Sequence, residues 1–183
     1  MKKLSFLLLM LIPAVQWAQA KYFTKDAVVS FFSDSPMEKI EATNTKGTCV
    51  LDGSTGNLEF AVLVTGFQFE KALMQEHFKE NYMEVGTYPK ATFKGKITNF
   101  QDVNLKADGT YQANVQGNLT IHGVTKPVNV KGQIKVSSGQ IIASTTFDVA
   151  CADYNIKIPA VVKDNIAKVV KVKIESKLQA LNQ

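Results

Sequence analysis

The chain has 183 residues, 45% of them hydrophobic and 20% charged, and a formal net charge of +5. This length suits one domain that buries its own core, and the chain has neither internal repeats nor low-complexity segments. The positive charge is weak, and the lysines alternate with apolar residues instead of clustering, so the composition does not favour nucleic-acid binding.

Residues 1–20 predict a cleaved export signal. Lys2 and Lys3 precede an apolar run at 4–15, and Ala18-Gln19-Ala20 fits the small-x-small cleavage rule. The run is shorter than the roughly 20 apolar residues of a membrane span, although a transmembrane anchor is the alternative interpretation. Cleavage takes the basic count from 21 to 19 against 16 acidic residues, a net charge of +3. We therefore expect one domain at 21–183, periplasmic or secreted, without a stable membrane anchor.

Cys49 and Cys151 remain after this cleavage. Export would permit a disulfide between them, but both lie in strand-like runs, and Cys151 shares the phase of Phe147 and Val149. A buried free thiol is equally natural there, so the sequence leaves both alternatives open. The chain has no CxxC motif and its two histidines are far apart, so we expect neither a metal site nor another cofactor.

The first half of the chain predicts strands followed by one helix. Segment 26–33 is rich in β-branched and aromatic residues, and 38–52 is extended but broken near Asn44 and Gly47. Segment 69–83 has many helix formers and no Gly or Pro, and its apolar residues are spaced four apart, which predicts an amphipathic helix. The expected inward row before this helix is Leu58, Phe60, Val62 and Val64; the helical stripes are Phe69, Leu73 and His77, and Met74, Phe78 and Tyr82.

The second half returns to strict alternation of apolar and polar residues. Segments 111–121 and 128–136 each have one apolar face, and the pattern breaks at Gly123, which predicts a long antiparallel hairpin. Strands at 91–99 and 141–149 flank this hairpin in sequence. The expected last strand carries Ile166, Val170, Val172, Ile174 and Leu178 on one face.

Together these patterns predict an all-β fold of about eight or nine strands with short connections. Because each strand has one polar face, a closed antiparallel up-and-down β-barrel of about eight strands would place every apolar row inside. A two-sheet sandwich is the alternative, since periodicity does not separate the two architectures.

Small residues in the inward rows raise the question of whether the barrel is hollow. They would leave volume for a small apolar guest, or they would merely bend the strands around a filled interior. The helix would close one end of the barrel through Leu73, Met74 and Phe78, or would pack against the outside as ordinary core. The small inward residues are Ala91, Gly95, Ala113, Gly117, Gly132 and Ala143.

Three motifs carry a resemblance to a known family. They are FEKALMQEHF followed by TYPKATFKG, the hairpin GNLTIHGVTKPV at Gly117–Val128, and DYNIKIP at Asp153–Pro159. In this order they resemble the YceI-like family of exported lipid-binding proteins. Two features depart from its pattern: Asn155 stands where the family usually has Gly, and the N-terminal segment lacks the common His-Ser-x-Ile-x-Phe motif. The resemblance implies a lipocalin-like barrel with an isoprenoid or other long amphiphile in its interior.

The two histidines are the candidates for chemistry. His122 lies in the hairpin turn, and we interpret it as hydrogen-bonded within its loop; we interpret His77 as a helix-packing residue. His122 has no carboxylate placed nearby in sequence to form a recognisable dyad, and no GxSxG, HExxH or phosphate-binding glycine loop is present. We therefore expect a binding protein and not an enzyme. An enzyme acting on a lipid headgroup through His122 or His77, and a filled-core structural or stress-response domain, are the alternatives.

The expected partner is a long-chain isoprenoid or another amphiphilic lipid, and the sequence leaves a homodimer open. The residues that we expect to contact the lipid lie on the inward rows and on the helix. They are Phe60, Val62, Phe67, Leu73, Met74, Phe78, Phe93, Ile97, Val115, Leu119, Val130 and Phe147.

Overall fold

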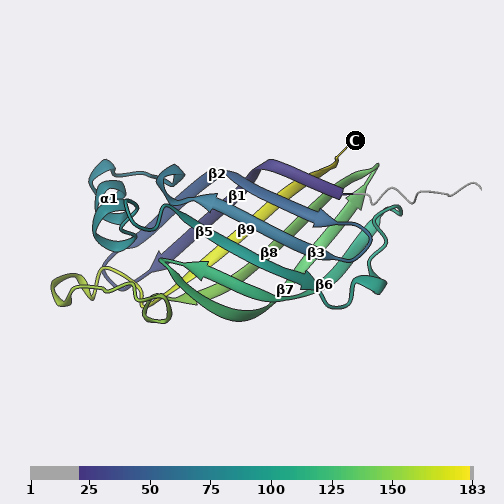
Figure 1. The fold of residues 1–183 in the computed structure, drawn as a ribbon. Coiled ribbons are helices and arrows are strands. Elements are labelled where there is room, and N and C mark those ends of the chain that lie inside the picture. The colour runs from purple at the N-terminus through teal and green to yellow at the C-terminus, as the bar shows by residue number, and fades with distance from the viewer. Residues whose placement is uncertain (1–20, 182–183) are drawn as a thin grey trace, which may run out of the picture.

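The computed structural model describes residues 21–181, and the expected export signal at 1–20 lies outside the described residues. This part of the chain consists mainly of long strands with one short helix (Figure 1). The strands are β1 (Lys21–Asp34), β2 (Lys39–Asp52), β3 (Asn57–Leu63), β4 (Gln68–Phe69), β5 (Lys90–Ile97), β6 (Gly109–Ile121), β7 (Val124–Ser137), β8 (Gln140–Ala150) and β9 (Val169–Ala180), and the helix is α1 (Ala72–His77).

The strands form a closed antiparallel barrel. Their order is β1-β9-β8-β7-β6-β5-β3-β2, and the pairing of β1 with β2 closes the ring of eight. The short strand β4 adds to β2. Closure gives nearly every strand a partner on both sides, which satisfies the backbone while the alternating apolar rows face inward. The barrel prediction is thus confirmed, and the sandwich alternative is wrong.

The hairpin of β6 and β7 runs in register over its whole length. Ile121 pairs with Val124, so the turn consists of His122 and Gly123, whose φ angles are 49° and 73°. Positive φ at both central residues is the geometry of a type I′ turn, whose twist matches that of the strands. The predicted hairpin is confirmed, and its second strand begins earlier than expected, at Val124.

The helical segment is shorter than predicted and is not regular. Phe69 belongs to β4 and pairs with Ala42, so the helix begins at Ala72 and not near residue 69. After His77 the chain continues as a π-helical turn, Phe78–Tyr82, in which the Met83 N–H donates to the Phe78 carbonyl at 2.9 Å. Spacing of apolar residues at four does not reveal this wider turn.

Two strand boundaries also differ from the expectation. Ile166 was expected on the last strand, but β9 begins only at Val169. The predicted break near Asn44 and Gly47 is a pair of register shifts between β1 and β2 within otherwise continuous strands. There Asn44 Nδ2 donates to the Leu63 carbonyl at 2.8 Å, and Asn44 Oδ1 accepts from the Lys46 N–H at 2.8 Å.

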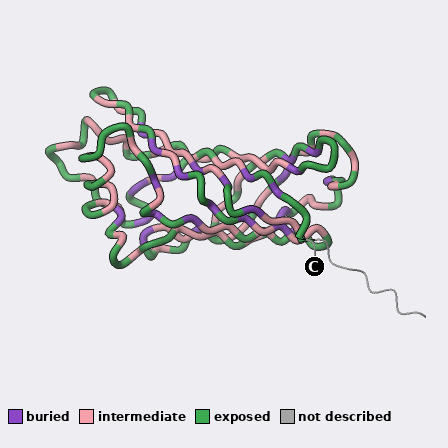
Figure 2. The backbone as a smooth tube through the Cα atoms, turned by 90° about the horizontal axis from the view of Figure 1, so that it is seen from above, coloured by how far each residue is buried: buried purple, intermediate pink, exposed green. Residues whose placement is uncertain are grey.

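One end of the barrel is filled by a compact core. The inward rows of β7, β8 and β9 contribute Ile134, Ile141 and Leu178, each no more than 2% exposed, and Val103 covers them from the β5–β6 connection. Figure 2 shows buried positions interspersed with exposed ones along the backbone. This is expected of a barrel with one layer of strands, because successive residues of a strand face the interior and the solvent in turn. The helix α1 and segment 151–168 lie together at the opposite end (Figure 1).

Candidate functional site

A cavity of about 540 Å³ extends through the barrel from the filled end toward α1. Its wall is made almost entirely of aliphatic and aromatic side chains from the strands, and α1 and segment 151–166 border it at the other end. There it reaches the surface, since the bordering residues Leu73 and His77 are exposed. The interior is therefore hollow, and the filled-core alternative is wrong.

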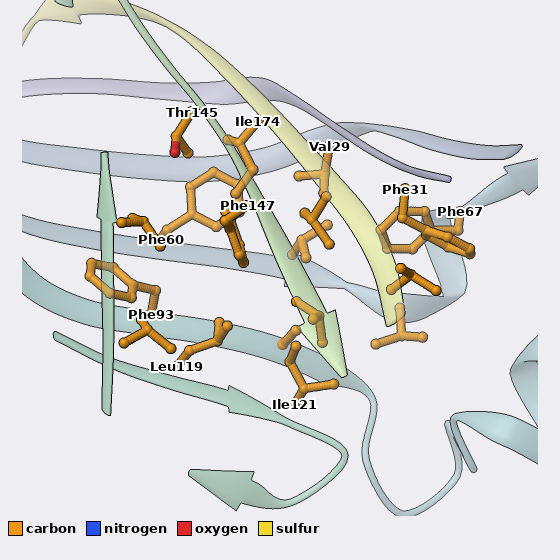
Figure 3. Close-up of a pocket in the computed structure, with 18 of the residues that line it drawn as sticks. Val29, Phe31, Phe60, Phe67, Phe93, Leu119, Ile121, Thr145, Phe147 and Ile174 are labelled. Carbon is orange, nitrogen blue, oxygen red and sulfur yellow. The ribbon is translucent and has the colours of Figure 1, made fainter. Parts of the chain in front are cut away.

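All of the residues predicted to contact a lipid border this cavity, although their contact with a ligand remains a prediction. Phe60, Phe93 and Phe147 project into the interior from β3, β5 and β8 (Figure 3). Ile97 lies toward the filled end. The remaining predicted residues on the cavity wall are Val62, Phe67, Leu73, Met74, Phe78, Val115, Leu119 and Val130.

The sequence left open whether the inward glycines create empty space or bend the strands, and in the structure they accommodate aromatic rings. A Cβ on Gly117 would lie 2.6 Å from Phe93 Cζ, and a Cβ on Gly47 would lie 2.8 Å from Phe60 Cζ. These glycines thus make room for aromatic rings that lie flat against the wall. The open volume results from the position of the rings as much as from the small residues.

Four phenylalanines gather beneath α1 at the open end. Phe78 stacks on Phe31 with ring centroids 5.3 Å apart, and Phe67 and Phe69 lie 5.7 and 5.0 Å from Phe78. We did not predict Phe31 as a site residue. Its alternation with Val29 and Ser33 on β1, both of which also border the cavity, is a signal that would have found it.

The open end is tied together on one side by polar contacts between three segments. Lys71, just before α1, places its Nζ 2.9 Å from Oε1 of Glu38, which directly precedes β2. This hydrogen bond lowers the pKa of the Glu38 carboxyl. The Met37 N–H donates to the Asp164 carbonyl at 3.3 Å. The Ala167 N–H donates to Ser33 Oγ at 2.8 Å. These bonds hold the β1–β2 turn against both α1 and segment 151–168.

Both cysteines are free thiols buried in the barrel wall, and both border the cavity. Burial raises the pKa of Cys49 to about 11, while a hydrogen bond with Ser176 opposes this shift. Burial also raises the pKa of Cys151. Of the two alternatives that the sequence left open, the structure therefore has the free thiols.

The two histidines occupy environments that differ from the predicted ones. His122 is 9% exposed, and its Nδ1 lies 3.1 Å from the carbonyl oxygen of Tyr154, in a different loop from its own. Its Nε2 has no hydrogen-bond partner within the described part of the chain and lies 3.8 Å from Glu84 Oε1. His77 is exposed at the open end of the cavity, so it is not a helix-packing residue.

Asn155 occupies the position at which the family pattern has Gly, and its backbone explains that preference. Its φ is 57°, in the left-handed region that favours Gly and that Asn tolerates better than most residues. The Asn155 N–H and the Ile156 N–H close the short helical turn Cys151–Tyr154 through the carbonyls of Ala152 and Cys151. This departure therefore preserves the loop that borders the cavity.

The site contains few groups suited to chemistry. Within residues 21–181 no three His, Cys, Asp or Glu side chains are placed to hold a metal ion. The titratable side chains that border the cavity are Glu38, Cys49, His77, Tyr82 and Cys151, and His122 does not border it. The arrangement is suited to enclosing an elongated apolar molecule.

None of the helices in the described residues is long and apolar enough to cross a bilayer.

Comparisons with solved structures agree with the barrel architecture. A polyisoprenoid-binding domain from Saccharophagus degradans, implicated in plant cell wall breakdown, matches with a TM-score of 0.78 and 14% identity over 90% of this chain and 100% of that one. Burkholderia cenocepacia BcnA matches with a TM-score of 0.67 and 19% identity over 84% of this chain and 96% of that one. A YceI protein from Campylobacter jejuni matches with a TM-score of 0.53 and 15% identity over the whole of both chains.

No curated protein matches the sequence. The family model described as the YceI-like domain matches residues 24–178, which include nearly all of the barrel and both ends of the cavity. The chain therefore belongs to the YceI-like family.

Proposed function

We propose that this protein binds a long-chain isoprenoid or a similar amphiphile inside its barrel and, after export, stores, sequesters or carries it. The observation that supports this most directly is the apolar cavity of about 540 Å³. That volume lies in the range of about 300–1,000 Å³ typical of small-molecule sites. The protein acts as a carrier and not as an enzyme.

The chemistry of the wall favours a chain without charge along its length. Burial in such a wall gains about 0.8 kcal/mol for each CH₂ group removed from water. The charge-bearing side chains Glu38 and His77 border the cavity at its open end, together with Asn165. We therefore place the apolar chain in the interior and the headgroup near α1.

The relatives support the same ligand class. The Saccharophagus degradans domain is described as polyisoprenoid-binding, and it shares the barrel with this chain. The predicted signal at 1–20 supports a periplasmic or secreted location. An insoluble lipid that crosses an aqueous compartment needs an enclosure of this kind, which gives the carrier role its physical reason.

Lipid extraction from the purified full-length protein tests this proposal. We expect mass spectrometry to detect an amphiphile with a long apolar chain, and we expect the delipidated protein to take up added solanesol, a long polyprenol. Albumin-free buffer and a heat-unfolded sample serve as controls for lipid that is carried over without being bound in the barrel. If the extract contains no amphiphile and the delipidated protein does not take up solanesol, the proposed function is wrong.

A further inference from the structure

The barrel wall is incomplete between β7 and β8. Their pairing starts at Ser137 with Gln140 and ends at Gly132 with Thr145. Beyond that pair, within residues 21–181, residues 124–131 of β7 pair with β6 alone, and residues 146–150 of β8 pair with β9 alone. Two strand edges thus face each other without backbone hydrogen bonds over the half of the barrel nearer α1. We call this opening the β7–β8 slit.

A side chain ends the ladder at the closed tip of the slit. Thr145 Oγ1 donates to the carbonyl of Lys131 at 2.8 Å. Because hydrogen-bonded and non-bonded pairs alternate in an antiparallel ladder, the next bonded pair would join Lys131 to Thr146. The Thr145 hydroxyl thus takes the acceptor that the Thr146 N–H would otherwise use, so the ladder stops at a defined position.

Pro127 lies on the unpaired edge of β7 and disfavours the binding of another strand there. The two-residue turn makes Ile121 and Val124 a bonded pair, so the alternation places Asn118 and Pro127 in a non-bonded pair. The missing N–H of Pro127 therefore faces the slit and not β6. A proline on an exposed edge prevents strand addition, which argues against a peptide as the occupant of the slit.

The cavity extends to the tip of the slit, where Thr145 also borders it. Gln133 and Ser144 form the last bonded pair before the tip, and both border the cavity although their side chains belong to the outer rows. The inward row of β7 also changes along its length. Ile134 and Val136 are 2% and 3% exposed, whereas Val128 and Val130, beside the slit, are only half-buried.

Contacts at the open end of the barrel hold the wide end of the slit. Lys126 Nζ on β7 lies 3.5 Å from Asp153 Oδ1, and His122 Nδ1 lies 3.1 Å from the Tyr154 carbonyl oxygen. Segment 151–154 thus bridges β7 and the end of β8. Between this bridge and Thr145, Phe147 on β8 projects into the interior (Figure 3), and Phe147 and Val128 pack against the same core cluster of Leu119, Val149 and Tyr154.

We propose that the β7–β8 slit is a side portal through which the amphiphile's chain passes into and out of the cavity; this rests on the proposed function. Passage at the open end would require a long chain to thread lengthwise past the phenylalanines beneath α1. Sideways passage displaces only side chains, because no ladder hydrogen bond joins the two edges. The chain then moves into the barrel along much of its length at once.

Cross-linking the two edges tests the portal. Asn129→Cys and Asp148→Cys would be opposite each other if the ladder continued, and both side chains are exposed. A short bismaleimide that joins them closes the slit. The matched control is Gln116→Cys with Asn129→Cys, a register pair on the intact β6–β7 ladder. Wild-type protein treated with the same reagent controls for reaction of the buried native thiols, and mass spectrometry verifies each link.

The readout is the rate of uptake and release of cis-parinaric acid, whose fluorescence rises in apolar surroundings. We expect the slit link to slow both rates about ten-fold or more, while the equilibrium affinity stays similar and the control link changes neither rate. As an independent variant, Thr145→Val frees the Lys131 carbonyl for the Thr146 N–H, which extends the ladder, shortens the slit and slows release relative to Thr146→Val. Equal rates in the slit-linked and control-linked proteins, or unchanged release in Thr145→Val, overturn the portal. Failure of every form, the unlinked protein included, to bind either this probe or solanesol overturns the proposed function instead.

Discussion

Gly95 and Gly117 face each other across β5 and β6, and the ring of Phe93 covers both of them. A Cβ at either position would lie 2.6 Å from Phe93 Cζ. A Cβ on Gly117 would also lie 2.5 Å from the Lys94 carbonyl oxygen, a backbone atom that cannot move away without separating the strands. The glycine pair therefore sets both the position of the ring in the cavity and the spacing of this part of the wall.

Gly117→Ala is expected to destabilise the barrel. The added methyl group overlaps backbone and ring together, so we expect the free energy of unfolding to fall by about 1–3 kcal/mol, as for an overpacked core. Urea denaturation followed by circular dichroism measures this. Gly86→Ala is the control, because no atom lies within 4 Å of a Cβ at that position. Equal stability of the two variants would contradict this account of the glycine pair.

Filling the cavity is expected to abolish lipid uptake without unfolding the protein. Ala143 borders the cavity from β8, and its neighbour Ile142 has its side chain on the outer face of the same strand. Ala143→Phe places a ring in the interior and should reduce the capacity for solanesol, whereas Ile142→Phe places the same ring outside and should not. Uptake is measured on delipidated protein. Full uptake by Ala143→Phe would show that the chain lies elsewhere.

The alternation of apolar and polar residues predicted the barrel and its cavity wall well. Inward rows such as Phe60 with Val62, or Phe93 with Ile97, depend only on the two-residue period of a strand, which the sequence displays directly. The His122-Gly123 turn was also recognisable, because only a few residue types accept two successive positive φ angles.

Features that depend on tertiary contacts were not predictable in this way. The π-helical turn after His77 and the pairing of Phe69 with β2 depend on what the barrel end presents to that segment. Burial of His122 depends on a loop 32 residues away in sequence. The alternation of apolar and polar residues does not reveal that the β7–β8 pairing ends at Thr145, because the same alternation continues along both strands beyond that residue.

Acid is expected to loosen the open end of the cavity through Glu38. Its pKa is lowered by the hydrogen bond from Lys71, so the folded state holds the carboxylate more readily than the unfolded state does. The pair therefore stabilises the fold at neutral pH, and this contribution is lost as the pH falls below about 4, through the unfolded and then the folded pKa. We expect Glu38→Gln to lower the melting temperature at pH 7 and to match wild type at low pH.

The control for this variant is Glu41→Gln on the adjoining strand β2, because Glu41 forms no ion pair within residues 21–181. Differential scanning fluorimetry between pH 3 and pH 7 provides the comparison at low ionic strength, since salt screens an exposed pair. A difference between Glu38→Gln and wild type that is the same at every pH would contradict a role for the carboxylate charge.

Alkaline conditions are expected to destabilise the barrel through Cys49. Burial raises its pKa to about 11, whereas an unfolded thiol loses its proton near pH 8.5. Between these two values the unfolded state binds fewer protons than the folded state, so stability falls as the pH rises, by up to about 1.4 kcal/mol for each pH unit.

Cys49→Ala removes this group, and its free energy of unfolding should fall less steeply from pH 8 to pH 10 than that of wild type. Urea denaturation at each pH measures both slopes, and Cys151→Ala shows how much of the remaining dependence comes from the second thiol. Identical slopes for wild type and Cys49→Ala would mean that this thiol loses its proton as readily in the folded barrel as in the unfolded chain, which would contradict the effect of its burial.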